Sequence, residues 1–244
     1  MRGKSFIECR NLYKSFGKKG VLQGVDLAVE RGETMVILGG SGSGKTVLLK
    51  HMNGLVGPES GEVFLDGMEI SRMEEDDLTE VRKKVAMVFQ GCALFDSMTI
   101  EENIAYPLQE HTAMSPKEIR SRMREALSLV GLEGSEELYP AEMSGGMKKR
   151  AALARALVLR PEALLYDEPT TGLDPMMTHR INRLIRELQN KLAVTSIVVT
   201  HDLQSAFVVA DRLAFLQKGK IRFVGTREEF QASTDLALHE FLSV

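Results

Sequence analysis

The chain has 244 residues, of which 43% are hydrophobic and 27% are charged, a composition typical of a globular protein with a sizeable core. Its net charge of −3, without a basic block, argues against nucleic acid as the main partner. The two cysteines, Cys9 and Cys92, lie far apart and outside any C-x-x-C motif. They therefore predict neither a zinc site nor a disulfide framework, and we expect both in the core.

The chain shows no pattern of a membrane-spanning or exported segment. No apolar run approaches the roughly 18 residues that a transmembrane helix needs, and residues 1–8 turn polar too early for a signal peptide. If the protein works at a membrane, we expect other chains to supply the membrane part.

The first ninety residues alternate between strand patterns and turns. Short strands are predicted at 5–9 and 25–29, and another at 62–67, which closes on a turn. Residues 34–38 are apolar throughout, which predicts a buried strand, and residues 47–52 continue as a helix. A further strand is predicted at 84–89 and ends at Gln90.

A glycine-rich loop that fits G-x-x-x-x-G-K-[ST] joins the strand at 34–38 to the following helix. Its glycines let backbone N–H groups converge on phosphate oxygens, and the helix start adds unpaired amides and a favourable dipole. Lys45 can reach the outer phosphates, and Thr46 offers a hydroxyl to Mg²⁺. The loop predicts a nucleotide site made of Gly39, Gly40, Ser41, Gly42, Ser43, Gly44, Lys45 and Thr46.

The pattern becomes helical from residue 99 to residue 159. One helix there is predicted to begin after Ser115, with Pro116 in its first turn and Glu118 completing a capping box, and to end near Gly131. Residues 163–166 and 196–199 are fully apolar, as in parallel strands covered on both faces, and a helix at 178–192 separates them.

The last part of the chain predicts a hairpin and a helical tail. The apolar segments 213–216 and 221–224 flank a turn at 217–220, and Thr226 caps the tail. We expect the tail to pack on the chain's own core, with contact to a second subunit as the alternative. The whole chain predicts a single α/β domain: a parallel-sheet core with a small antiparallel layer (1–90 and 161–225), an inserted helical subdomain (91–160) and the tail (226–244).

Polar residues follow three of the predicted strands directly. Asp167 and Glu168 end the strand at 163–166, which places two carboxylates beside the phosphate loop in such sheets. Asp167 is suited to hold Mg²⁺, and Glu168 to orient and polarise an attacking water. Gln90 is placed to touch Mg²⁺ or that water, although alone it is equally compatible with a surface glutamine. His201 follows the strand at 196–199 and is expected near the γ-phosphate.

A second helix start is also suited to an anion. Ser144, Gly145 and Gly146 precede a helical segment in which Ser144 is a good cap and the two glycines allow close backbone approach. Many ordinary helices begin in this way, so the motif by itself does not establish a binding site.

The order of these elements is more specific than any one of them. It runs from the phosphate loop through Gln90, Ser144-Gly145-Gly146, Asp167-Glu168 and Thr171-Gly172-Leu173-Asp174 to His201. This order resembles the ATP-binding subunits of ABC transporters over essentially the whole chain. The resemblance implies a RecA-like P-loop NTPase core that hydrolyses ATP with Mg²⁺.

The same resemblance implies a head-to-tail homodimer with two ATP molecules between its subunits. The motif at 144–146 of one subunit then faces the phosphate loop of the other, so neither site is complete in a monomer, and Asp174 lies in a loop at the dimer interface. Phe16 matches the aromatic residue that stacks on adenine, with Tyr13 as the second candidate. The segment after Gln90 lines a groove for a helix of a multispanning permease.

Two departures from the family pattern are present. Met147 stands where the family usually has glutamine, and Val47 follows Thr46 where Ser or Thr is commoner. With Met147, the residues at 144–147, 149–156, 91–99 and 105–112 are similar to the ATPases of Mla-type transporters, the MCE-associated or toluene-tolerance systems.

That similarity implies phospholipid cargo moved between inner and outer membranes. It also implies a periplasmic MCE-domain lipid-binding protein as a further partner, and a place on the cytoplasmic face of the bacterial inner membrane, held there by the permease. Two alternatives stay open. One is the ATPase of an amino-acid or lipoprotein transporter, and the other is a soluble ABC ATPase that transports nothing.

Overall fold

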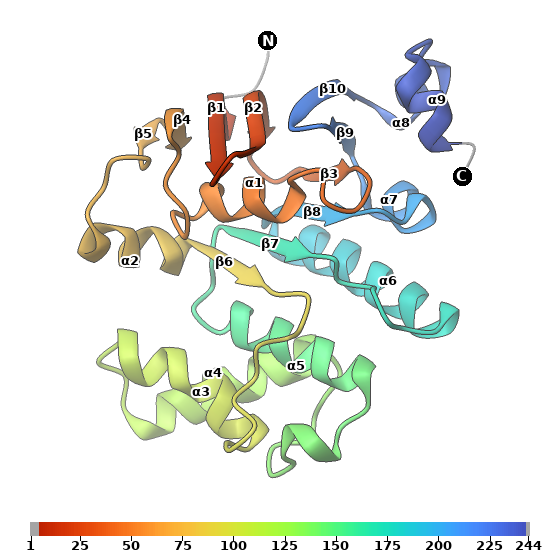
Figure 1. Cartoon of the computed structure of the whole chain (residues 1–244). Helices are drawn as coiled ribbons and strands as arrows, with labels where there is room; N and C mark the ends of the chain where they lie inside the picture. Colours follow the sequence, from red (N-terminus) through yellow and green to blue (C-terminus); the bar gives the residue numbers. More distant parts are fainter. Residues whose placement is uncertain (1–4, 243–244) are drawn as a thin grey trace.

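The computed structural model describes residues 5–242. The first four and last two residues, which include both ends of the predicted domain, lie outside the described residues. A parallel sheet runs through the middle of the molecule, with a smaller antiparallel sheet on one side and a group of three helices on the other (Figure 1). The predicted α/β class, with its parallel core and small antiparallel layer, is confirmed.

The central sheet has six strands in the order β10-β9-β3-β8-β7-β6. Five of them run parallel, and only β10 pairs antiparallel, with β9. The order brings the carboxyl ends of β3, β8 and β7 to one edge, where parallel sheets bind their ligands. The strands are β3 (Thr34–Leu38), β6 (Val85–Val88), β7 (Ala163–Asp167), β8 (Thr195–Thr200), β9 (Arg212–Gln217) and β10 (Lys220–Gly225).

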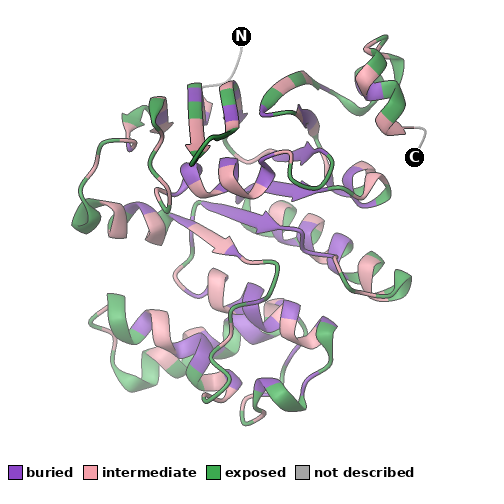
Figure 2. Cartoon of the chain, viewed as in Figure 1, coloured by how far each residue is buried: buried purple, intermediate pink, exposed green. Residues whose placement is uncertain are grey.

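Both faces of this sheet are covered, as its apolar strands predict. Met35 and Ile37 of β3 pack toward helix α1 (Lys45–Met52) and the antiparallel sheet. Val36 and Leu38 pack into the other core, which includes the helical group. Alternate residues of a strand point to opposite faces, so one short apolar run supplies both cores. Figure 2 shows the resulting band of buried residues along the central strands.

The antiparallel sheet has the order β2-β1-β4-β5, formed by β1 (Ser5–Phe16), β2 (Lys19–Glu30), β4 (Ser60–Leu65) and β5 (Met68–Glu69). The predicted strands at 5–9 and 25–29 were too short, because β1 and β2 form one long hairpin. Register shifts follow Cys9 and Leu12, and Asn11 has a φ of +47°. Such bulges break the alternation of side chains, so the sequence pattern stops where the strand continues.

Three helices form the group below the sheet in Figure 1: α3 (Ile100–His111), α4 (Pro116–Leu129) and α5 (Gly145–Leu157). All three lie within the predicted subdomain at 91–160. The capping box is confirmed, since the Ser115 hydroxyl accepts from the Glu118 amide. The helical pattern from 99 to 159 is not continuous, however. Gly131, with a φ of +64°, follows the end of α4, and irregular chain with one short 3₁₀ helix, Pro140–Glu142, leads to α5.

Two helices were missed by the pattern. Helix α2 (Glu75–Lys84) buries only Val81, so it has no apolar stripe. Because this helix includes Lys84, the strand predicted to begin at 84 begins at Val85 instead. Helix α7 (Leu203–Val209) has only two turns. Helix α6 (Pro175–Leu192) begins earlier than predicted, because Asp174 caps it by accepting a hydrogen bond from the Met177 amide.

The tail forms two short helices, α8 (Arg227–Ala232) and α9 (Leu236–Leu242). Phe230 and Leu238 are fully buried against the chain's own core, in agreement with the expected packing. The predicted hairpin is present, with a tighter turn at Lys218 and Gly219, which both have positive φ. Within residues 5–242, no helix is both long enough and apolar enough to cross a bilayer.

Candidate nucleotide-binding site

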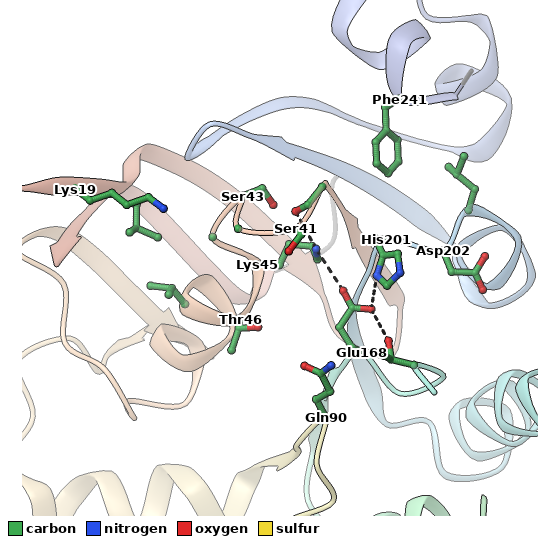
Figure 3. Close-up of a pocket in the computed structure, with 17 residues that line it drawn as sticks. Lys19, Ser41, Ser43, Lys45, Thr46, Gln90, Glu168, His201, Asp202 and Phe241 are labelled. Carbon is green, nitrogen blue, oxygen red and sulfur yellow. Dashed lines mark hydrogen bonds and ion pairs between the residues drawn. The ribbon is translucent and has the colours of Figure 1, made fainter. Parts of the chain in front are cut away.

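The glycine-rich loop connects β3 directly to α1, as predicted (Figure 3). Gly44 precedes the helix with a φ of +107°, a conformation that residues with a side chain rarely adopt. A Cβ atom at Gly39 would lie 2.3 Å from the backbone oxygen of Leu216, so no side chain fits there. Helix α1 starts without a side-chain cap, so the amides of its first turn have no side-chain acceptor and are suited to bind an anion.

Lys45 is buried at the base of this loop, with 7% of its side chain exposed. Its Nζ donates hydrogen bonds to the backbone oxygens of Gly39 at 2.8 Å and Gly40 at 3.2 Å. It also lies 3.3 Å from Oε1 of Glu168 (Figure 3). The ammonium of Lys45 thus lies against backbone oxygens of its own loop and beside the carboxylate that follows β7.

Thr46 and Asp167 meet at the start of α1. The Thr46 hydroxyl donates a 2.8 Å hydrogen bond to Oδ1 of Asp167. Burial raises the pKa of the Asp167 carboxyl, against the lowering effect of the Thr46 hydrogen bond, and the neighbouring Glu168 raises it further. A bound cation would stabilise the ionised carboxylate and so offset the free-energy cost of burying its charge. A hydroxyl and a carboxylate at this distance are the oxygen donors that Mg²⁺ prefers, so the residues present fit the metal.

Glu168 lies directly after β7, with a φ of +48°, and its amide donates to the backbone oxygen of Val199 at 3.0 Å. Its Oε2 accepts a hydrogen bond from Thr171 at 3.2 Å and lies 3.0 Å from Nδ1 of His201 (Figure 3). The strand that precedes His201 pairs with β7 in parallel, as expected, with Val199 opposite Asp167. Two neighbouring strands thus bring a carboxylate and an imidazole together with Lys45.

These side chains open onto one cavity of about 1190 Å³. Gln90, which follows β6, lines it together with Glu168 and His201 (Figure 3). Gly39 and Asp167 are not in its wall, but they contact Lys45 and Thr46, which are. The cavity therefore gathers most of the predicted site: Gly40, Ser41, Gly42, Ser43, Gly44, Lys45, Thr46, Gln90, Glu168 and His201.

The cavity wall includes residues that the sequence did not single out. Lys19 and Val21 come from β2, Asp202 and Leu203 follow His201, and Phe241 comes from the tail. Phe241 lies against Phe215 of β9, with ring centroids 5.1 Å apart. No local signal marks Phe241, because its place depends on how α9 docks.

The predicted adenine-stacking residues stand apart from this cavity. Phe16 is 54% exposed at the end of β1, and Tyr13 is 41% exposed on the same strand, and neither lines the cavity wall. Their role stays a prediction.

The motif at 144–146 and Asp174 are also outside the cavity of their own chain. The Ser144 hydroxyl accepts from the Met147 amide at 3.3 Å and caps α5. Ser144, Gly145 and Asp174 are exposed, and Leu173 lies beside Gly145. Two helix starts therefore lie close together on one exposed surface. Met147 packs its side chain against the chain's own core.

The fold and this cavity define a P-loop nucleotide-binding protein, whose phosphate loop faces a carboxylate pair and a histidine. Comparisons with known proteins place it further. The family model described as ABC transporter matches residues 22–171. The chain belongs to the ABC transporter family of ATP-binding proteins, which confirms the family inferred from the order of motifs.

Individual relatives agree with this assignment. The chain is 42% identical over 97% of its length to the probable ribonucleotide transport ATP-binding protein mkl of Mycobacterium tuberculosis, and it spans 66% of the length of that protein. It is 41% identical to the intermembrane phospholipid transport system ATP-binding protein MlaF of Haemophilus influenzae, covering 98% of this chain and 90% of that one. A solved structure, the dimeric ATP-binding cassette MJ0796 bound to ADP and Pi, matches with a TM-score of 0.83 and 33% identity over 90% of this chain and 98% of that one.

Proposed function

We propose that this chain is the ATP-hydrolysing subunit of a transporter that moves phospholipid between the inner and outer membranes. The observation that carries the ATPase is the cavity in which Lys45, Glu168 and His201 meet at the phosphate loop. The cargo is supported by the similarity to MlaF, and the alternative reading as a ribonucleotide transporter by the similarity to mkl.

Each residue of the site has a task that its geometry supports. The loop amides and Lys45 bind the phosphates, and the Lys45 ammonium compensates the charge that develops on the γ-phosphate. Thr46, Gln90 and Asp167 would hold Mg²⁺, which supplies further positive charge when bound. Glu168 accepts a hydrogen bond from the attacking water and aligns it. His201 contacts the γ-phosphate and fixes the position of the Glu168 carboxylate.

A second copy of the chain completes the site. The exposed helix start at Ser144 and Gly145 is a donor surface for an anion, yet it lies outside its own cavity. In the head-to-tail homodimer it closes over the phosphates bound by the other subunit, and Asp174 lies at the contact between the two. The dimeric form of MJ0796 supports this arrangement.

The coupling to a membrane subunit uses the groove between the sheet core and the helical group. A cavity of about 370 Å³ lies there, with walls from β6, α2, α3 and α5. Phe89 of this wall immediately precedes Gln90. A permease helix seated in the groove would move with the segment that carries Gln90, because closure of the dimer shifts the helical group relative to the sheet. The chain would thereby be held on the cytoplasmic face of the inner membrane.

Purification of the tagged chain from the membranes of its host tests this proposal. We expect a multispanning permease and an MCE-domain protein to co-purify, with phospholipid identified by mass spectrometry of the complex. Recovery without any membrane protein would favour the soluble ABC ATPase. A permease complex that contains no MCE-domain protein and no phospholipid would overturn the lipid cargo while leaving the ATPase intact.

A further inference from the structure

Lys149 places an ammonium group in the interior, just over one turn into α5. The residue is 8% exposed, and among the lysines of residues 5–242 only Lys45 and Lys149 are buried. No described carboxylate forms an ion pair with it. Its Nζ instead donates to the backbone oxygen of Gln90 at 2.6 Å and lies 3.5 Å from the backbone oxygen of Glu168.

These two oxygens belong to the ends of neighbouring strands. Strands β6 and β7 pair in parallel, with Val88 opposite Tyr166, so Gln90 and Glu168 leave the sheet at the same edge. A buried ammonium is costly unless fixed dipoles surround it, so its two carbonyl partners must keep their positions. Lys149 thus clamps the backbone at the two places from which the side chains of the proposed metal site and water site emerge.

The clamp acts on a strained residue. Glu168 has a φ of +48°, a left-handed conformation that costs free energy for a residue with a side chain. Its amide donates to Val199, and its carbonyl faces Lys149. These two contacts hold the peptide units on either side of Glu168, whose carboxylate contacts Lys45 and His201.

The same helix has its start on the exposed surface formed by Ser144 and Gly145. We propose that Lys149 is a positioning residue that links the two ATP sites. This inference rests on the head-to-tail dimer of the proposed function. When the start of α5 engages the phosphates bound by the other subunit, the rigid helix carries the movement to Lys149. Lys149 then sets the backbone of Gln90 and Glu168 in its own site. Binding of ATP at one site would therefore change the catalytic geometry of the other site.

Substitution of Lys149 by methionine tests this link, because methionine keeps an unbranched side chain but removes the charge and the donors. In the transporter complex, we expect kcat for ATP hydrolysis to fall about 10- to 100-fold, the scale of a small misplacement of catalytic groups. We expect the affinity for ATP, measured by calorimetry, to stay near that of the wild type. The link predicts a Hill coefficient for ATP above 1 in the wild type, and this coefficient should fall to about 1 in the variant because the two sites are no longer coupled. A wild-type Hill coefficient of 1 would overturn the link.

Lys148 provides the matched control. It is the preceding lysine on α5 and is half-exposed, and among the described residues its ammonium has no hydrogen bond or ion pair, while its backbone amide donates to Ser144 within the helix. Lys148→Met should keep the wild-type kcat and Hill coefficient. If Lys149→Met behaves like Lys148→Met in both quantities, the proposal is overturned.

A second variant covers the case in which Lys149→Met does not fold. Lys149→Gln keeps one amide donor, so we expect a folded protein with kcat and Hill coefficient between those of the wild type and the values above. If a folded Lys149→Gln protein has the wild-type kcat and the wild-type Hill coefficient, the proposed role of the Lys149 ammonium is overturned. A wild-type complex without ATPase activity would instead contradict the proposed function itself, so the two failures are distinguishable.

Discussion

The ammonium of Lys45 and the carboxylate of Glu168 lie 3.3 Å apart, with 7% and 11% of their side chains exposed. Lys45 belongs to the phosphate loop and Glu168 to the end of β7, so this ion pair joins the phosphate-binding part of the site to the proposed water-activating part. A γ-phosphate bound by Lys45 would compete with the carboxylate for the same ammonium. Binding of ATP would then release Glu168 to contact water.

Glu168→Gln should keep ATP binding and lose turnover. The uncharged glutamine amide competes less strongly for Lys45 than the carboxylate does, so we expect ATP affinity equal to or above that of the wild type. Loss of the carboxylate that aligns water should lower kcat about 10²- to 10⁴-fold. Closed dimer should accumulate with ATP in size-exclusion chromatography. Glu162→Gln, on the exposed residue before β7, is the control and should hydrolyse normally. A wild-type rate in Glu168→Gln would remove Glu168 from its proposed role.

Lys45→Ala should weaken nucleotide binding itself. Charge-assisted hydrogen bonds contribute about 1.5–3 kcal/mol, so we expect ATP affinity to fall at least tenfold in a calorimetric titration. The exposed Lys84, at the end of α2, provides a control variant, Lys84→Ala, with unchanged affinity. Unchanged affinity in Lys45→Ala would count against the phosphate-loop assignment.

Asp167→Asn distinguishes the proposed binding of Mg²⁺ by Asp167 from the effect of its buried carboxylate on the stability of the fold. Burial raises the pKa of Asp167 above its ordinary value of 3.8, so folding disfavours the ionised carboxylate. This penalty is absent below the ordinary pKa and complete above the raised one. At pH 7, therefore, Asp167→Asn should unfold at the same temperature as the wild type or a higher one, and near pH 3.8 the advantage should vanish. In the presence of ATP, addition of Mg²⁺ should raise the unfolding temperature of the wild type more than that of Asp167→Asn. An equal increase with Mg²⁺ in both proteins would exclude Asp167 as a metal ligand.

His51 should make the fold sensitive to acid. It is 1% exposed, its Nδ1 lies 2.6 Å from the Val47 oxygen, and burial lowers its pKa below the ordinary value of 6.5. A group with a lowered native pKa stabilises the fold above its ordinary pKa, and this contribution is lost as the pH falls through the native value. Urea unfolding should show stability decreasing from pH 7 to pH 5, less so in His51→Leu. His179→Asn, on an exposed residue of α6, should keep the wild-type dependence. The same slope in His51→Leu would contradict this assignment.

Phe230 should anchor the tail. It is fully buried, with its ring 5.3 Å from that of Phe223 and 6.0 Å from that of Phe207, both in edge-to-face geometry. Phe230→Ala should lower the free energy of unfolding by about 3–5 kcal/mol. Phe16→Ala, at an exposed position, should change stability by less than about 0.5 kcal/mol and lower ATP affinity instead. If Phe230→Ala is as stable as Phe16→Ala, the tail does not depend on this contact.

Much of the site was predictable because its signals are local. The loop from Gly39 to Thr46 lies between an apolar strand and a helix, and the carboxylates at 167 and 168 end another apolar strand. In a parallel sheet, such strand ends meet at one edge, so the closeness of the loop and the carboxylates follows from the strand order. The capping box at Ser115 is equally local, since it involves residues only three apart.

Other features were not predictable from the pattern. Helix α2 has no apolar stripe, because only Val81 is buried, and the long hairpin of β1 and β2 loses its alternation at bulges. Periodicity reports only how regularly side chains are buried. It therefore fails where an element lies almost entirely at the surface or where its register shifts.

The sequence by itself determined that this protein has a phosphate loop, a carboxylate pair and a capped second helix start in the order of an ABC ATPase. Only the tertiary structure decided that Lys149 contacts the carbonyls of Gln90 and Glu168, 59 and 19 residues away, and that Phe241 reaches the cavity wall. Caps, loops and strand ends depend on neighbouring residues in the chain. Contacts between distant segments depend on which strands pair and how helices dock, and these become defined only when the whole core packs.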